Sequence, residues 1–130
     1  MNSNDNGGSK LNELSWEIHT NAKQKGFWEE EALPTKLALI HAEVSEALEE
    51  LRLESTEETQ YYYTHAVECM KAAQNQCICV PKPEGFAVEL VDVLIRTLDI
   101  LAYLGEDVDK IVKDKMKFNA HRSRMHGKRF

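Results

Sequence analysis

Apolar residues recur every three or four positions along most of the chain, which is the spacing of amphipathic α-helices. Alternating apolar and polar runs are few, and no Asn-Gly or Asp-Gly turn joins two β-branched segments. The pattern predicts helices at about 10–25, 35–53, 56–75, 85–104 and 106–120. Turn-forming residues separate them, namely Pro34, Pro81, Pro83, Gly85 and Gly105. The predicted fold class is all-α, a bundle of four to five helices.

The segment from about 54 to 84 differs from its surroundings. It contains three successive tyrosines, all three cysteines and two prolines, and it lacks a regular apolar stripe. We expect a helical insertion, or a lid-like connection, between two core helices. Residues 1–9 are rich in Gly, Ser and Asn and are expected to be a disordered lead-in. Residues 10–130 are expected to form one domain with a basic tail at 121–130.

The second predicted helix carries acids beside its apolar arc. At about 100° per residue, its core-facing positions are Leu37, Ile40, Val44, Ala47 and Leu51. Glu43, Glu46 and Glu50 form the neighbouring stripe, and Glu49 points away from it. Because like charges at these spacings repel one another, the stripe is either a solvated helix edge or part of a cation site.

The helix predicted at 85–104 is apolar around most of its circumference, which is typical of a buried helix. Its remaining arc contains Glu89, Asp92, Arg96 and Asp99. Buried carboxylates become protonated, pair with a cation or bind a metal. Pairing of Arg96 with Asp92 or Asp99 would account for one acid only. The two acidic motifs together therefore favour a metal site.

The ligand chemistry indicates which metal is expected. Four carboxylates offer hard oxygen ligands, which suit Mg²⁺ or Mn²⁺ better than zinc. A di-iron carboxylate bundle is the competing interpretation, but it normally takes Glu-x-x-His from two helices. This chain contains no Glu-x-x-His. We therefore expect Mg²⁺, with Mn²⁺ as a possible substitute.

Composition and charge limit the classes of partner and the cell compartment that we expect for this protein. The 130-residue chain has a formal net charge of -6, with much of its positive charge between Lys110 and Arg129. This balance argues against nucleic acid as the main partner. No apolar run reaches the roughly 18 residues of a membrane span, and no signal peptide is visible. We therefore expect a cytoplasmic protein without a membrane partner, whose three cysteines are reduced thiols.

Two acidic motifs are followed by two basic ones: Glu43-Val-Ser-Glu46, Glu89-Leu-Val-Asp92, Lys115-x-x-x-Asn119-x-x-Arg122 and His126-Gly-Lys-Arg-Phe130. From about Leu14 to Phe130, the chain resembles the all-α nucleoside triphosphate pyrophosphohydrolases of the MazG-like superfamily, which also includes dimeric dUTPases and dCTP pyrophosphatases. The resemblance implies Mg²⁺-dependent hydrolysis of a (d)NTP to a monophosphate and diphosphate, as a house-cleaning activity on canonical or modified nucleotides. It also implies a homodimer or a homotetramer.

The resemblance assigns roles to individual residues. The implied metal ligands are Glu43, Glu46, Glu89 and Asp92. The implied phosphate-binding residues are Lys115, Asn119, Arg122 and Lys128. His19 and Trp28 resemble positions that line the base pocket. Which base or sugar is bound stays open at this point.

The chemistry also supports such a site without the resemblance. Carboxylates would repel the roughly four negative charges of a triphosphate, so cations and basic side chains must complete the site. Lys115, Asn119 and Arg122 recur at helical spacing and share one face. Glu46 or Glu50 is expected to orient the attacking water as the catalytic general base.

Simpler or different interpretations compete with these assignments. Taken alone, Trp28 would be a core residue and His19 a helix-surface residue. The segment 54–84 also offers one nitrogen and three sulfur ligands for a structural zinc ion, from His65, Cys69, Cys77 and Cys79. Ordinary reduced cysteines are the simpler expectation. The alternative functions are a catalytically inactive nucleotide- or metal-binding module of the same fold, or a hydrolase of a non-nucleotide phosphoanhydride.

Overall fold

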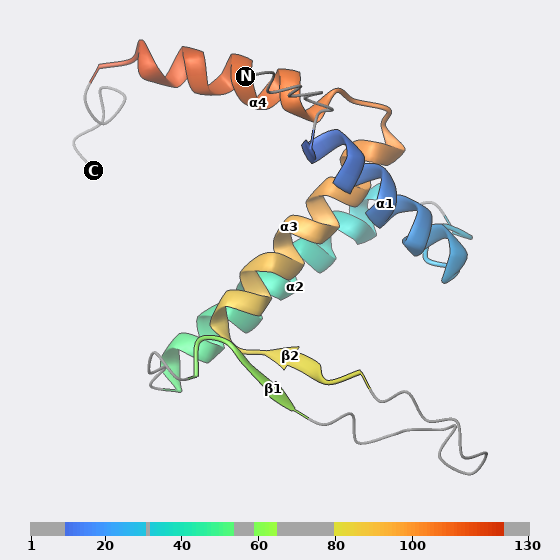
Figure 1. Ribbon diagram of the computed structural model, residues 1–130, viewed down its shortest axis with the longest axis vertical. Helices are drawn as coiled ribbons and strands as arrows, with labels where there is room; N and C mark the ends of the chain where they lie inside the picture. Colours follow the sequence, from blue (N-terminus) through green and yellow to red (C-terminus); the bar gives the residue numbers. More distant parts are fainter. Residues whose placement is uncertain (1–9, 31, 54–58, 65–79, 124–130) are drawn as a thin grey trace, which may run out of the picture. The chain divides into compact units, whose positions relative to one another are not determined.

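The computed structural model describes residues 10–30, 32–53, 59–64 and 80–123. Four helices lie in these ranges: α1 (Lys10–Gln24), α2 (Leu33–Arg52), α3 (Phe86–Tyr103) and α4 (Val108–Ala120) (Figure 1). Each lies within two residues of a helix predicted from the sequence, so the mostly helical fold is confirmed. None of these helices is long and apolar enough to cross a lipid bilayer.

A short antiparallel ladder lies in the segment between α2 and α3. Its strands are β1 (Tyr62–Thr64) and β2 (Lys82–Glu84), paired so that Tyr63 lies opposite Pro83. In a two-stranded ladder each strand keeps one free edge, where the missing N–H of a proline costs no hydrogen bond. Pro83 is therefore compatible with β2.

The helix predicted at 56–75 is wrong over residues 59–64, which form a turn and β1 instead. Consecutive Tyr and Thr side chains favour extended backbone over helix, and pairing with β2 satisfies one edge of that backbone. The helical insertion is thus corrected in its described part. The proposed zinc ligands at 65–79 lie outside the described residues.

The chain divides into two compact units, one of residues 1–31 and 97–130 and the other of residues 32–96. The boundary falls within α3, so this helix contributes to both units. The buried side chains of the first unit are Ser15, His19, Trp28, Leu98, Ala102 and Val108. Ser15 Oγ donates to the carbonyl oxygen of Leu98 over 2.7 Å, which joins α1 directly to the backbone of α3.

Side chains from two elements cap the start of α4. Asp107 Oδ1 accepts from the Lys110 N–H over 3.1 Å, and Asn12 Oδ1 of α1 accepts from the Val108 N–H over 2.7 Å. The Asn12 side-chain amide also donates to Asp107 over 2.8 Å. The first two of these bonds satisfy backbone donors that a helix N-terminus leaves unpaired. The bonds of Asn12 also fix α1 against α4.

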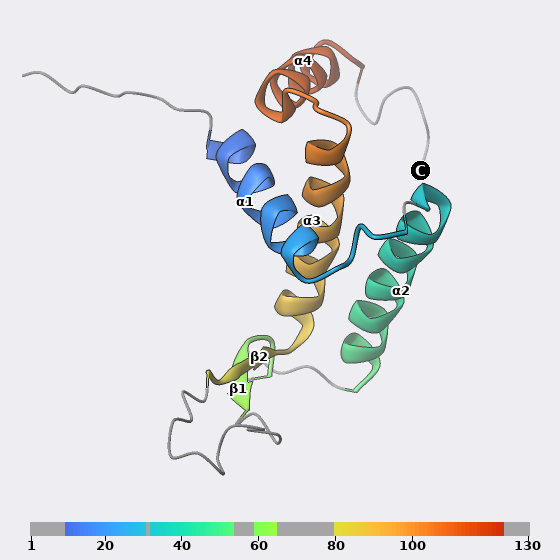
Figure 2. The same cartoon turned by 90° about the vertical axis from the view of Figure 1, so that its right-hand side faces the viewer.

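In the second unit, α2 runs antiparallel to the first part of α3 (Figures 1 and 2). The only buried residues of α2 are Glu43 and Ala47. The predicted core positions Leu37, Val44 and Leu51 are 54%, 50% and 52% exposed. The prediction of a single core-facing arc on α2 is therefore wrong for these three, because the packed side lies towards Glu43 and Ala47.

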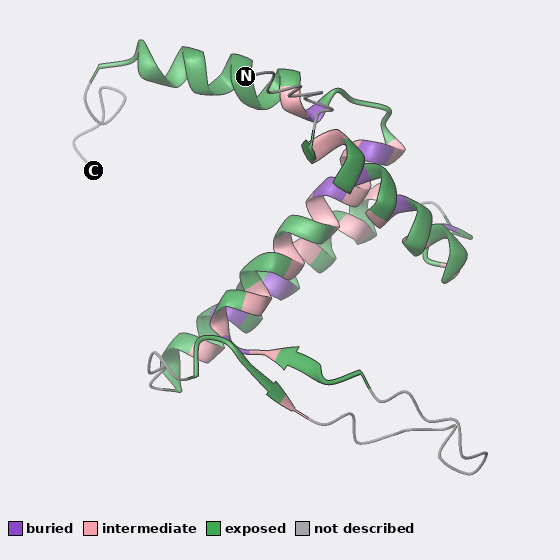
Figure 3. Cartoon of the chain, viewed as in Figure 1, coloured by how far each residue is buried: buried purple, intermediate pink, exposed green. Residues whose placement is uncertain are grey.

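The first part of α3 is likewise less buried than its apolar sequence predicts. Its exposed large residues are Leu90, Val91, Leu94 and Ile95. Figure 3 shows exposed surface along both helices of this unit. Within the described residues, α3 interacts with α2 through Glu89 and Arg96, and these four apolar side chains are left open to solvent.

Candidate metal centre

Three glutamates of the second unit bring their carboxylates together. One oxygen each from Glu43, Glu46 and Glu89 lies within 4.8 Å of the other two. A spacing of three residues places Glu43 and Glu46 on the same face of α2, and Glu89 comes from the first turn of α3. Glu43 is 7% exposed, Glu89 is half-buried and Glu46 is exposed. The cluster thus reaches from the protein interior to solvent.

Burial and mutual repulsion act on these charges in the same direction. Loss of solvation, and then repulsion from Glu46, raises the pKa of Glu89. Loss of solvation, and then repulsion from Glu43, raises the pKa of Asp92. Such shifts mean that the surrounding positive charge does not offset the negative charge of the ionised carboxylates. A divalent cation at the cluster would supply the missing charge.

Arg96 supplies part of that charge. Its Nε donates to Oε1 of Glu43 over 2.6 Å, and the Glu43 side chain is only 10% exposed. Arg96 also lowers the pKa of Asp92, although burial and repulsion outweigh this effect. The alternative in which Arg96 pairs with Asp99 is wrong, because Asp99 binds His19 and Trp28 instead.

The donor set fits a small divalent cation. All three residues offer carboxylate oxygens, the ligand type that Mg²⁺ and Mn²⁺ prefer. Two oxygens on opposite sides of one Mg²⁺ lie about 4 Å apart, given Mg–O bonds of about 2.1 Å. A cluster with all oxygens within 4.8 Å needs only small side-chain adjustments to reach that spacing.

Two further acids were predicted at the site. Asp92 follows Glu89 by one turn of α3 and is repelled by both Glu43 and Glu46, so it lies at the edge of the cluster. Glu50 follows Glu46 by one turn of α2 and is half-buried. Neither belongs to the group of three whose oxygens lie within 4.8 Å. Their roles as fourth ligand and as general base stay predictions.

The predicted phosphate-binding residues belong to the first unit, unlike the carboxylates. Lys115, Asn119 and Arg122 are all exposed. The Lys115 ammonium lies 5.2 Å and the Arg122 guanidinium 5.6 Å from the centroid of the Phe118 ring, so two cations flank one aromatic side chain. Lys128 lies outside the described residues. A phosphate-binding role for this set stays a prediction.

The predicted base-pocket residues lie together around Asp99. Because a carboxylate only accepts hydrogen bonds, His19 donates from Nδ1 to Oδ1 of Asp99 over 2.7 Å. The indole Nε1 of Trp28 donates to both Asp99 oxygens, over 2.9 and 3.1 Å. The Trp28 ring stacks on Tyr103 with centroids 4.3 Å apart. The interpretation of His19 as a surface residue is therefore wrong.

Asp99 and Tyr103 are the residues of this cluster that the sequence analysis missed. Asp99 stood out as an acid on an apolar helix, but it was considered only as a partner for Arg96. Tyr103 follows Asp99 by one turn, so the two share a face of α3. An acid on an apolar helix, one turn before an aromatic residue, was the available signal.

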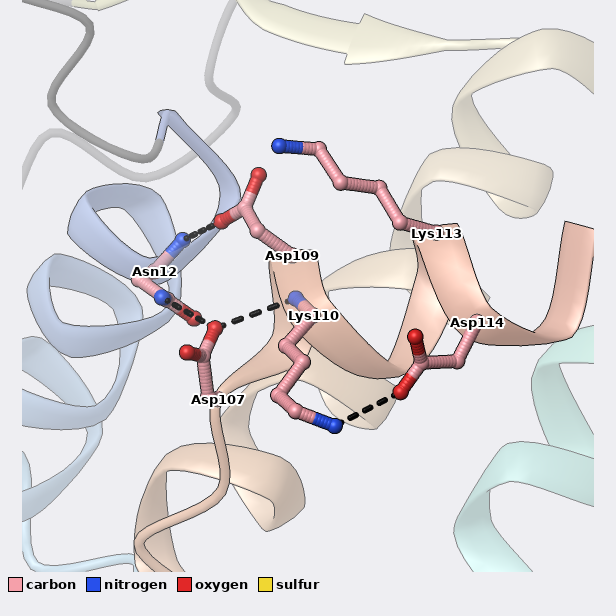
Figure 4. A pocket seen from close by; sticks show the side chains of 6 residues that line it. All are labelled: Asn12, Asp107, Asp109, Lys110, Lys113 and Asp114. Atoms are coloured by element: carbon pink, nitrogen blue, oxygen red, sulfur yellow. Dashed lines mark hydrogen bonds and ion pairs between the residues drawn. The ribbon is translucent and has the colours of Figure 1, made fainter. Parts of the chain in front are cut away.

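A pocket of about 320 Å³ lies in the first unit, lined by Asn12, Asp107, Asp109, Lys110, Lys113 and Asp114 (Figure 4). Its polar groups largely bind one another. The Asn12 N–H donates to Asp109 over 3.0 Å, and Lys110 Nζ pairs with Asp114 over 2.7 Å. The pocket is explained by the capping of α4 and contains none of the predicted site residues.

Comparisons of the chain with known protein families, with curated proteins and with solved structures give no match. Function is therefore inferred from the geometry and charge of the carboxylate cluster.

Proposed function

We propose that the protein is an Mg²⁺-dependent nucleoside triphosphate pyrophosphohydrolase of the MazG-like type, acting in the cytosol on canonical or modified (d)NTPs. The observation that carries the proposal is the convergence of Glu43, Glu46 and Glu89 within 4.8 Å, from two helices. The raised pKa of Glu89 and of Asp92 supports it, because both acids lie where a cation would relieve repulsion.

Each residue has a defined part in the proposed reaction. Glu43, Glu46, Glu89 and Asp92 hold Mg²⁺, which when bound polarises the phosphate oxygens and neutralises charge on the leaving group. Arg96 keeps Glu43 in place through its 2.6 Å hydrogen bond. The resemblance assigns phosphate binding to Lys115, Asn119, Arg122 and Lys128, and the lining of the base pocket to His19 and Trp28.

The proposed hydrolysis is a simple displacement at phosphorus. A water oxygen bonds to phosphorus, the α–β bridging P–O bond breaks, and diphosphate leaves. Glu46 or Glu50 accepts the proton of that water as general base. Glu46 is the better placed of the two, because it is exposed and belongs to the cluster.

Product identity tests the proposal. The purified protein is incubated with a panel of (d)NTPs and Mg²⁺, and released pyrophosphate and orthophosphate are assayed separately. We expect stoichiometric pyrophosphate and monophosphate from at least one nucleotide. Orthophosphate as the sole product would contradict α–β cleavage. Tight nucleotide binding without any product would instead support the inactive binding module.

We also propose that the protein works as a homodimer or homotetramer. Leu37, Val44, Leu48 and Leu51 share one face of α2 and are each at least 50% exposed. Contiguous apolar surface of this kind is typical of interaction sites. We call these four residues the apolar ridge of α2. A second copy of the chain has the same ridge, and two ridges related by a twofold axis would cover each other.

A further inference from the structure

The hairpin of β1 and β2 is fixed to the start of α3, next to the acidic motif. The Gln60 carbonyl, just before β1, accepts from the Ala87 N–H of α3 over 3.0 Å. Gly85 joins β2 to α3 with φ +114°, and a Cβ there would lie 2.5 Å from the Gln60 oxygen. Only glycine fits this conformation and this close approach. Residues of β2 are therefore held at a defined place beside α3.

Lys82 of β2 brings a positive charge to this place. Its Nζ lies 2.9 Å from Oε1 of Glu84, two residues further along the strand. Residues two apart in a strand share one face, so Glu84 holds the ammonium on that face. The Lys82 side chain is 67% exposed, against 30% for Glu84. The ammonium is thus anchored on one side and open to solvent on the other.

The acids of the cluster lie within electrostatic reach of Lys82. Both Glu89 and Asp92 contribute to the raised pKa of Lys82, after its stronger interaction with Glu84. The hydrogen bond of Lys82 nevertheless goes to Glu84 and not to either acid of α3.

We propose that Lys82 is a further phosphate-contacting residue, which binds the diphosphate portion of a triphosphate held at the carboxylate cluster. The inference rests on the proposed function and adds a residue that the acidic and basic motifs do not include. A lysine suits this role because its ammonium acts as a mobile point charge towards phosphate oxygens. Of the other described cations of residues 32–96, Arg96 is bound to Glu43, Arg52 lies beside Glu49 and Lys36 lies in the first turn of α2.

The competing explanation is a surface ion pair that only stabilises the hairpin. Exposed pairs contribute about 0–1 kcal/mol to stability, and such a role would require Lys82 and Glu84 equally. Phosphate binding would require only the lysine. Lys82→Gln and Glu84→Gln both remove the ion pair, but only the first removes the cation. The two variants are therefore matched for this test.

The experiment measures two affinities for each variant: Mn²⁺ alone, and inorganic pyrophosphate in saturating Mn²⁺. In Lys82→Gln we expect pyrophosphate binding to weaken about tenfold or more, as for the loss of a charged hydrogen bond. Mn²⁺ alone should bind roughly two- to fivefold tighter, because a nearby like charge has been removed. Glu84→Gln should keep pyrophosphate affinity within about threefold of the wild type.

Opposite changes in the two affinities distinguish phosphate contact from a folding defect, which would weaken both. Equal loss of pyrophosphate binding in Lys82→Gln and Glu84→Gln, or no loss in either, would overturn the inference. The titrations need no turnover. A wild type that binds Mn²⁺ and pyrophosphate but hydrolyses no nucleotide would refute the proposed function, while the comparison of variants would still decide the role of Lys82.

Discussion

Arg96 of α3 donates from Nε to Oε1 of Glu43 on α2 over 2.6 Å, at the buried end of the carboxylate cluster. The pair joins the two helices that carry the proposed metal ligands. It also gives Glu43 a counter-charge that Glu89 lacks among its main electrostatic influences. Glu43 therefore has an arginine counter-charge, whereas the negative charges of Glu89 and Asp92 are not fully offset.

Removing this arginine is expected to destabilise the metal-free protein. Arg96→Gln leaves the nearly buried Glu43 carboxylate without its charged donor, which costs roughly 1–3 kcal/mol. Saturating Mn²⁺ should restore part of this loss, because the metal replaces the missing positive charge. Urea unfolding with and without Mn²⁺ measures both effects.

Arg52→Gln is the matched control, since Arg52 and Glu49 are both more than 60% exposed and lie 3.7 Å apart. Its effect should stay below about 0.5 kcal/mol. Equal destabilisation by the two substitutions would contradict a special role for Arg96.

The stability of the metal-free protein should depend on the raised pKa values of Glu89 and Asp92. In the folded state both acids hold their protons to higher pH than in the unfolded state, whose values are near 4.5 and 3.8. Their contribution therefore falls as pH rises through the window above those values, and it is lowest at neutral pH. Mn²⁺ should stabilise the protein more at pH 7.5 than at pH 5.

Thermal unfolding of the wild type, Glu89→Gln and Asp92→Asn between about pH 5 and pH 7.5 tests this. The quantity to compare is the difference in unfolding free energy between the wild type and each variant at each pH. Each variant should lose the part of the pH dependence that its acid contributes, and most of the Mn²⁺ stabilisation, which reaches about 2.7 kcal/mol at a hundredfold excess over Kd. If the stability of both variants in metal-free buffer changed with pH as much as that of the wild type, uncompensated repulsion at the cluster would be contradicted.

Asp99 should be important for the stability of the first unit. Its carboxylate accepts from both His19 and Trp28, whereas the Asn side chain of Asp99→Asn has only one acceptor oxygen. We expect a loss of about 1–3 kcal/mol in unfolding free energy. Chemical unfolding followed by tryptophan fluorescence measures it. Asp114→Asn, which affects only the exposed pair with Lys110, should cost less than about 0.5 kcal/mol.

The apolar ridge of α2 predicts the assembly state. Leu48→Glu places a charge in the middle of the ridge and should shift the protein from dimer or tetramer towards monomer, because burying that charge is costly. Light scattering coupled to size-exclusion chromatography gives the mass directly. Glu49→Gln changes the neighbouring exposed position and should leave the mass unaltered. A monomeric wild type would refute the proposed assembly.

Local features of the chain could be predicted from the sequence. Helical periodicity located α1, α2, α3 and α4 to within two residues, because each helix depends on its own side-chain spacing. The same geometry placed Glu43 and Glu46 on one face of α2. That these two acids lie near Glu89 could also be predicted, because an acid on an apolar helix needs a partner or a cation.

Features that depend on distant partners could not be predicted in this way. β1 pairs with a strand on the other side of the segment 65–79, and periodicity contains no information about that pairing. Arg96 and Asp99 were identified as charged residues on an apolar helix, but their partners come from α2, α1 and Trp28. The exposure of Val44 likewise depends on which surfaces cover α2, and not on its sequence alone.

The central claim is that the carboxylate cluster performs pyrophosphohydrolysis, and one measurement tests it most directly. Pyrophosphate release from the preferred (d)NTP is compared between the wild type, Glu89→Gln and Glu49→Gln in Mg²⁺, after unfolding curves have confirmed that each variant is folded. We predict that kcat/KM falls at least about 100-fold in Glu89→Gln, while Glu49→Gln retains wild-type activity. Undiminished pyrophosphate release by folded Glu89→Gln would contradict a metal centre at Glu43, Glu46 and Glu89.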